Sequence, residues 1–224
     1  MRQFSTEHLA ALGVMVVAAG VSVWVARRAG ERAIAVMSGA IALVILAGWI
    51  GEQVADVVEG IWSVEYTLPL QLTDVVSLTA IVALLRPRPL LVELTYFWAL
   101  TASLQATLTP DLARTFPSVF YFTYFGYHVG AIVAACLLVF GRRMYPRPRA
   151  AWRVFAATLV VAAVAAVADL VTGGNYMYLR SKPVHSSLLN LMGPWPWYIV
   201  EAAAFGLVLL LALEALTPRR APRP

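Results

Sequence analysis

Seven apolar runs, each long enough to cross a bilayer as a helix, dominate the sequence. A transmembrane helix needs about 20 mostly apolar residues, within a range of roughly 17 to 25. Because hydrocarbon offers no hydrogen-bond partners to the backbone, such runs fold as helices. The sequence therefore predicts an all-α, polytopic membrane protein with seven transmembrane helices: Leu9–Ala26, Ala33–Gly51, Leu68–Leu85, Leu90–Leu108, Val119–Phe140, Trp152–Val171 and Trp197–Leu216.

Composition excludes a soluble domain. Hydrophobic residues make up 61% of the chain and charged residues only 13%, and the mean hydropathy is +0.76. Soluble domains carry about 25% charged residues. We expect a single transmembrane domain over residues 1–217 and a short basic tail rich in proline and arginine over residues 218–224.

The basic residues divide unequally between the two sides that seven spans create. Four of the 17 fall on the side of the N-terminus, namely Arg2, Arg114, Arg180 and Lys182, and the other thirteen fall on the opposite side. Because short cytoplasmic loops are enriched in Lys and Arg, this predicts an outer N-terminus and a cytoplasmic C-terminus. Topology thus accounts for the net charge of +5. No basic patch indicates nucleic acid as a partner.

Polar residues interrupt five of the spans near one predicted membrane face. Gln71, Thr73 and Asp74 fall within four residues near the outer end of the third span, and His128 lies deeper, about nine residues into the fifth. An ionisable residue in hydrocarbon is costly and indicates a functional site. Three further polar residues lie at the outer ends of the fourth, sixth and seventh spans: Gln105, Asp169 and Glu201.

We therefore expect one polar cavity that opens toward the outer leaflet. Asp74, His128, Asp169 and Glu201 should face the bundle interior and gather in it, because lipid cannot satisfy their polar groups. Each carboxylate also has a simpler interpretation as the partner of a backbone N–H or of a basic side chain. Likewise, the hydroxyl of Thr73 has the alternative of bonding the carbonyl four residues before it.

Nothing in the sequence indicates a metal or another cofactor. The single cysteine, Cys136, falls on an apolar run and is expected to be a packing residue. The spacing of His8, His128 and His185 matches no metal-binding pattern. His8 and His185 fall outside the hydrocarbon and are predicted to be surface residues, with His185 a spare candidate base.

Short motifs run through nearly the whole chain, and Gly193-Pro194-Trp195-Pro196-Trp197-Tyr198 is the most specific of them. The others are Phe4-Ser5-x-x-His8, Leu68-Pro69-Leu70-Gln71-Leu72, Thr109-Pro110-Asp111, Phe120-x-x-x-Tyr124, Asn175-Tyr176-x-Tyr178, Lys182-Pro183 and Ser187-Leu188-Leu189. Together they resemble the bacterial YwaF-like integral membrane family, which is related to the eukaryotic transmembrane protein 164 acyltransferases. The resemblance implies a seven-helix protein of the bacterial cytoplasmic (inner) membrane. It further implies acyl exchange on ether phospholipids, which the eukaryotic relatives perform through a cysteine nucleophile.

This sequence departs from the family at the nucleophile, because Thr73 stands where the family usually has cysteine. A threonine hydroxyl is a weaker nucleophile than a thiol and needs an adjacent base. The hypothesis is therefore that Thr73 attacks an ester carbonyl, His128 acts as general base, and Asp74 or Asp169 orients the imidazole.

The predicted substrate is a membrane phospholipid ester, and the reaction is hydrolysis or acyl transfer. The lipid, its acyl chain and the oligomeric state stay open. Tyr124 shares a helix face with His128, while Asn175 and Trp195 fall in the connection 172–196, whose length suggests a function. The residues predicted to bind substrate are Gln71, Gln105, Tyr124, Asn175, Trp195 and Glu201.

Two other classes of function use the same polar layer. A transporter or small-solute binder would place its site there. Against a transporter, seven spans do not divide into two equal repeats, and no span is clearly interrupted. The other alternative is a non-catalytic scaffold or sensor, in which the polar layer serves only to hold the helices together.

Overall fold

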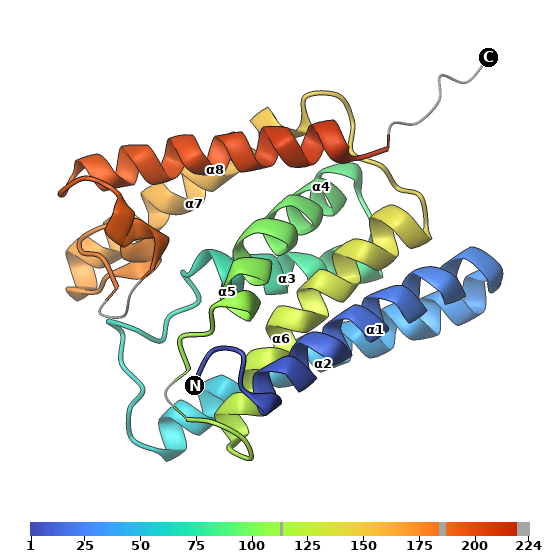
Figure 1. Ribbon diagram of the computed structural model, residues 1–224, viewed down its shortest axis with the longest axis horizontal. Helices are drawn as coiled ribbons and strands as arrows, with labels where there is room; N and C mark the ends of the chain where they lie inside the picture. The colour runs from blue at the N-terminus through green and yellow to red at the C-terminus, as the bar shows by residue number, and fades with distance from the viewer. Residues whose placement is uncertain (113, 184–186, 219–224) are drawn as a thin grey trace.

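The computed structural model describes residues 1–112, 114–183 and 187–218. Within these ranges every regular element is a helix (Figure 1). The α-helices are α1 (Thr6–Arg28), α2 (Glu31–Val58), α3 (Leu72–Leu85), α4 (Pro89–Trp98), α5 (Leu104–Leu108), α6 (Val119–Cys136), α7 (Ala150–Thr172) and α8 (Trp197–Leu216). Four short helices complete the fold: the π-helices η1 (Ala99–Ser103) and η2 (Leu137–Gly141), and the 3₁₀-helices η3 (Tyr176–Tyr178) and η4 (Leu188–Leu191).

Five helices are long and apolar enough to cross a membrane: α1, α2, α6 together with η2, α7 and α8. Helix α3 has 14 residues and is about 21 Å long at 1.5 Å per residue, short of the roughly 30 Å of hydrocarbon. Helices α4, η1 and α5 follow one another without a break, so the fourth expected span is helical from Pro89 to Leu108. The structure thus supports five of the seven expected spans by length and composition.

The helices alternate in direction, so that connections gather at two opposite ends of the molecule (Figure 1). One end carries the N-terminus and residues 59–71, 109–112, 114–118, 173–183 and 187–196, and is called here the loop end. The other end carries the short connections after α1, α3 and η2 and is called the turn end.

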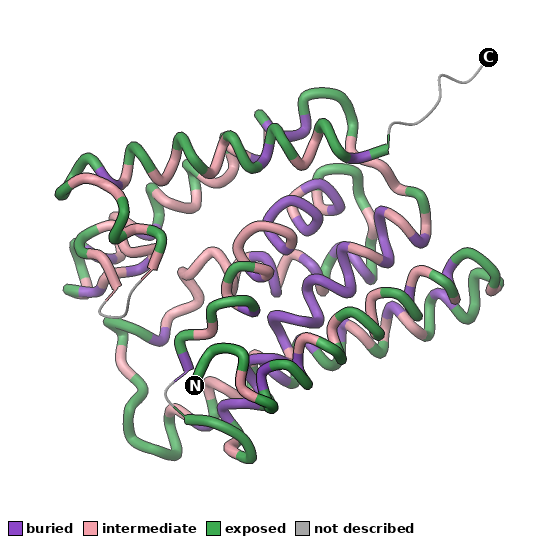
Figure 2. Tube along the Cα trace, in the orientation of Figure 1, coloured by how far each residue is buried: buried purple, intermediate pink, exposed green. Residues whose placement is uncertain are grey.

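Helix α6 lies at the centre of the bundle. Within its most apolar window 78% of the residues are buried, against 6% for α8 (Figure 2). Helices α1 and α2 cover one side of α6, and α7 pairs with α8 on the far side of α3 and α4 (Figure 1). The outer helices expose apolar side chains such as Val164 and Val208. Such a surface is suited to lipid.

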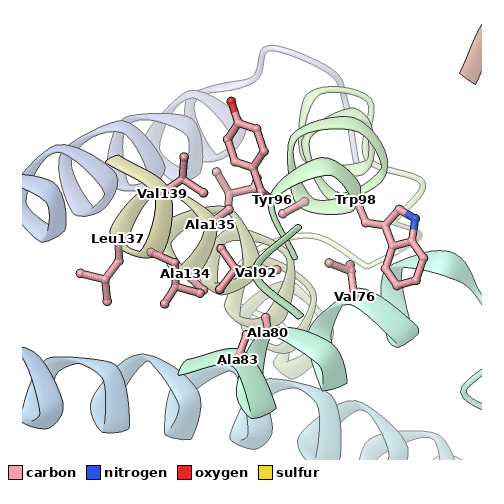
Figure 3. Packing of buried hydrophobic residues seen from close by; sticks show 14 of the residues in the cluster. Val76, Ala80, Ala83, Val92, Tyr96, Trp98, Ala134, Ala135, Leu137 and Val139 are labelled. Atoms are coloured by element: carbon pink, nitrogen blue, oxygen red, sulfur yellow. The ribbon is translucent and has the colours of Figure 1, made fainter. Parts of the chain in front are cut away.

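Small residues let the helices approach closely. A Cβ atom on Gly48 of α2 would lie 3.0 Å from the carbonyl oxygen of Thr123 in α6, and one on Gly130 of α6 would lie 2.5 Å from Cγ1 of Ile45. Close backbone approach of this kind strengthens helix packing in membranes. Figure 3 shows the adjoining core, where Ala80 and Ala83 of α3 and Ala134 and Ala135 of α6 lie around Val92 of α4.

Two carboxylates connect neighbouring helices at the turn end. The carboxylate of Glu93 is 1% exposed and accepts hydrogen bonds from Arg147 Nε at 2.8 Å and from Arg153 Nη2 at 2.9 Å. The carboxylate of Glu214 on α8 accepts from the backbone N–H groups of Ala150 and Ala151, the first residues of α7. These contacts fix α4, α7 and α8 to one another at the turn end.

Candidate functional site

Helix α3 begins four residues later than the apolar pattern predicts. The expected start was Leu68, but the backbone becomes helical at Leu72, after Pro69. The side chain of Asp74 accepts a hydrogen bond from the N–H of Gln71 at 3.1 Å and so caps the helix. The oxygen Oε1 of Gln71 accepts from the N–H of Met177 at 2.9 Å, which joins the start of α3 to η3.

This boundary places Thr73 in the first turn of α3. Its carbonyl oxygen accepts from the hydroxyl of Ser77, but within the described chain its own hydroxyl forms no hydrogen bond. The alternative in which that hydroxyl bonds the carbonyl four residues earlier is therefore wrong. The residue at that distance, Pro69, precedes the helix.

His128 lies in the middle of α6 and is 2% exposed. Its ring packs against those of Tyr124 and Tyr127, at centroid distances of 4.4 and 4.3 Å. The hydroxyl of Tyr124 donates to the carbonyl oxygen of Ala106 at 2.8 Å, and this bond fixes the tyrosine. The nitrogen Nδ1 of His128 is buried and has no hydrogen-bond partner among the described residues. A buried ring nitrogen without a partner is costly and calls for an explanation.

A cavity of about 740 Å³ at the loop end brings several predicted site residues together. Five of them line it: Gln71, Thr73, Gln105, Tyr124 and His128. The N-terminal residues, the segment around Pro110 and the residues of η4 also form its walls. It will be called the loop-end cavity.

The carboxylates predicted to share this cavity do not line it. Asp74 turns back to the N–H of Gln71, Asp169 accepts from the N–H of Tyr176 at 2.7 Å, and Glu201 accepts from the N–H of Gly193 at 3.0 Å. The expectation that Asp74, Asp169 and Glu201 gather with His128 in one cavity is thus wrong. Each carboxylate instead caps a local turn, and none of them contacts the His128 ring.

Asn175 and Trp195 also bond within the segment 173–196 and do not line the cavity. The amide of Asn175 donates to the carbonyl oxygen of Ser181 and accepts from the N–H groups of Arg180 and Ser181. The indole of Trp195 donates to the carbonyl oxygen of Leu179 at 3.2 Å. Their placement therefore shapes the segment that covers the cavity.

The other two histidines, His8 and His185, were both predicted to lie at the surface. His8 is instead fully buried. Its Nδ1 accepts from the N–H of Phe4 at 2.8 Å, and its Nε2 lies 2.8 Å from the carbonyl oxygen of Thr107, so it ties α1 to α5. His185 falls outside the described residues.

Three residues of the site were missed from the sequence: Asp111, Tyr127 and Tyr178, all of which line the cavity. Burial and then the charge of Asp111 raise the pKa of Tyr178 above its ordinary value, so its phenol stays protonated. Tyr127 had one available signal, its position next to a histidine in an apolar span. Asp111 belongs to the motif Thr109-Pro110-Asp111, which marked a loop without marking a site.

In the described part of the chain, no three His, Cys, Asp or Glu side chains converge as metal ligands would. The polar groups at the cavity are instead the hydroxyls of two threonines and a serine, an imidazole, three amides, three phenols and the carboxylate of Asp111. This set combines a hydroxyl with a group able to take its proton.

The fold and this cavity define an all-helical integral membrane protein with a polar chamber at one end of its bundle. Residues 3–213 match the model of the TMEM164 family. The chain belongs to the TMEM164 family, which confirms the resemblance to the transmembrane protein 164 relatives. Comparison with curated proteins and with solved structures gave no match.

Proposed function

We propose that this protein is an intramembrane acyl-transfer enzyme that acts on phospholipid esters, with Thr73 as nucleophile and His128 as general base. One observation carries the proposal: the side chains of Thr73, whose hydroxyl forms no hydrogen bond within the described chain, and of His128 line the same cavity. Family membership supports it, because Thr73 stands where the resemblance implies a cysteine nucleophile.

In the first half-reaction, Oγ1 of Thr73 attacks the ester carbonyl carbon while His128 takes the hydroxyl proton. The ester C–O bond then breaks, and the leaving lysophospholipid oxygen receives that proton from the imidazolium. Thr73 is left as an acyl ester. The second half-reaction reverses these roles: water or a second lysophospholipid attacks the acyl-threonine, and His128 removes the proton of the attacking hydroxyl. The bond between Oγ1 and the acyl group then breaks, and the imidazolium returns the proton to the Thr73 oxygen.

The first turn of α3 supplies a place for the negative charge of the tetrahedral intermediate. The first intrahelical bonds of α3 run from Asp74 and Val75 to the carbonyl of Gln71. The N–H groups of Leu72 and Thr73 precede these bonds and have no intrahelical acceptor. Free N–H groups at a helix start, together with the helix dipole, stabilise an oxyanion.

No carboxylate orients His128 in this arrangement. The rings of Tyr124 and Tyr127 both pack against the imidazole, and its Nδ1 has no hydrogen-bond partner among the described residues. The proposed centre is therefore a Thr–His pair rather than a triad. Gln105 and Tyr124 line the same cavity and are proposed to contact the polar part of the lipid.

We further propose that the chain crosses a bacterial cytoplasmic membrane seven times, with the loop end outside. In a Cys136→Ala background, Leu191→Cys at the loop end is expected to react with an impermeant maleimide in intact cells. Arg143→Cys at the turn end is expected to react only after the membrane is permeabilised. Both positions are exposed, so accessibility follows from sidedness. The reverse pattern would overturn the orientation.

A covalent probe tests the nucleophile. An alkyl fluorophosphonate incubated with the protein in lipid nanodiscs is expected to modify the peptide that contains Thr73, as read by mass spectrometry. Thr73→Val should abolish this labelling. Thr79→Val is the matched control, because Thr79 lies on the same helix and its hydroxyl already donates to the carbonyl of Val75 at 2.7 Å. Labelling that persists in Thr73→Val would contradict the assignment.

A further inference from the structure

A second, narrower pocket lies next to the loop-end cavity. It has a volume of about 260 Å³. It lies between α7 and α8 on one side and the continuous helix formed by α4 and η1 on the other. Most of its wall is apolar, and we call it the α8 pocket. Five residues line both spaces: Leu72, Met177, Tyr178, Leu189 and Ala202. The two spaces therefore adjoin at the start of α3, one residue from Thr73.

The α8 pocket extends along most of a membrane leaflet. On α8 its wall runs from Tyr198 to Leu210, a distance of about 18 Å at 1.5 Å per residue. One leaflet of hydrocarbon is about 15 Å thick. The indole N–H of Trp98 donates to the hydroxyl of Thr158 at 2.8 Å, so the polar groups of these two wall residues are already paired. The pocket thus offers an apolar chain a long, narrow surface, on which the polar groups of Trp98 and Thr158 are already hydrogen-bonded to each other.

The shape of the α8 pocket follows from how α8 is attached. At the turn end the carboxylate of Glu214 binds α7, and at the loop end the hydroxyl of Tyr198 donates to the carbonyl oxygen of Tyr178 at 2.5 Å. Between these two attachments α8 carries small residues, including Ala203 and Gly206, on the pocket wall. A Cβ atom on Gly206 would meet no atom within 4 Å. Fixed ends and a small-residue middle leave room for a ligand.

We infer that the α8 pocket holds the acyl chain of the phospholipid whose ester carbonyl is presented to Thr73, an inference that rests on the proposed function. With the carbonyl at Thr73, the more apolar α8 pocket is reached past Leu72, which lines both spaces. Burial of each methylene in an apolar site contributes about 0.8 kcal/mol relative to water. A groove of about 860 Å³ between α1, α2 and α6 is larger, but it shares no lining residue with the cavity.

Acyl-chain selectivity tests this inference. Gly206→Leu places a side chain into open space, so the variant is expected to fold, and leucine favours a helix more than glycine does. It should shorten the pocket. Turnover of a palmitoyl phospholipid is expected to fall at least tenfold, whereas turnover of an octanoyl phospholipid is expected to be unchanged. The matched control is Gly20→Leu on α1, where an added Cβ also meets nothing within 4 Å.

A readout without turnover separates this inference from the proposed chemistry. A phospholipid with a diazirine at the end of its acyl chain is expected to crosslink to the pocket walls on α7 and α8, around Phe155 and Leu210. Gly206→Leu should move the crosslinks toward the loop end. Crosslinking there by a protein that shows no turnover would refute the Thr73 chemistry and keep the pocket. Equal loss of both chain lengths, or crosslinks confined to other helices, would overturn the pocket.

Discussion

Thr73→Val is expected to lower lipid acyl turnover by about a thousandfold or more. Valine matches threonine in shape but removes the hydroxyl, and that hydroxyl takes part in no hydrogen bond of the described structure. Loss of turnover would therefore reflect lost chemistry rather than lost folding. Turnover is measured by mass spectrometry of lysophospholipid and acyl products from protein in nanodiscs, with the melting temperature as the folding control.

The same prediction extends to His128, the proposed general base for Thr73. His128→Ala should lower turnover about as far as Thr73→Val, and the double variant should be little worse than either, because residues that act as one unit are not additive. Thr73→Cys should keep or raise turnover, since a thiol ionises more easily than a hydroxyl. If Thr73→Val keeps full turnover, the hydroxyl is structural and the nucleophile is another group, such as a water activated by His128.

Glu93→Ala is expected to reduce the free energy of unfolding by about 2 kcal/mol. Removal of this buried carboxylate deprives the side chains of Arg147 and Arg153 of their common acceptor, and also the backbone N–H of Arg147. The two guanidinium groups are partly exposed, at 50% and 36%, so water moderates the effect. The measurement is reversible unfolding in mixed micelles titrated with sodium dodecyl sulfate.

The control for this ion pair lies at the same end of the molecule. Glu31 is 85% exposed and lies 3.6 Å from Arg142, so Glu31→Ala should change the free energy of unfolding by no more than about 0.5 kcal/mol. Equal effects of Glu31→Ala and Glu93→Ala would mean that burial contributes nothing at Glu93. The turn end would then owe its stability to apolar packing alone.

The lengths of the apolar runs allowed much of the fold to be predicted from the sequence. Helix α8 begins and ends at the predicted residues, Trp197 and Leu216, because Pro196 and a long apolar run define its start and extent. Helix α3 was predicted less well. Its apolar run begins at Leu68, but the carboxylate of Asp74 caps the N–H of Gln71, and the local spacing Gln71-x-x-Asp74 was the signal that would have moved the start.

The candidate site could be predicted from the sequence only in part. Thr73 was identified because it stands beside Gln71 and Asp74 where the resembling family has cysteine, and His128 because an imidazole in an apolar span is rare. The structure places both on one cavity. The carboxylates Asp169 and Glu201 are equally rare there, but each accepts a hydrogen bond from a backbone N–H within ten residues of its own position. The sequence shows that a carboxylate is present, not which donor it meets. Similarly, the burial of His8 depends on α5, which is distant in the sequence.

The π-helix η1 determines the direction in which the side chains of α5 point, because α5 continues the same helix directly after η1. A π turn holds one residue more than an α turn, and such turns are frequent at functional sites. In an ideal helix each residue advances the side chains by about 100°. Shortening η1 by one residue would therefore rotate Gln105 away from the cavity, and with it the carbonyl of Ala106 that holds the Tyr124 hydroxyl. The orientation of Tyr124 beside the imidazole thus depends on a single additional backbone residue in a neighbouring helix.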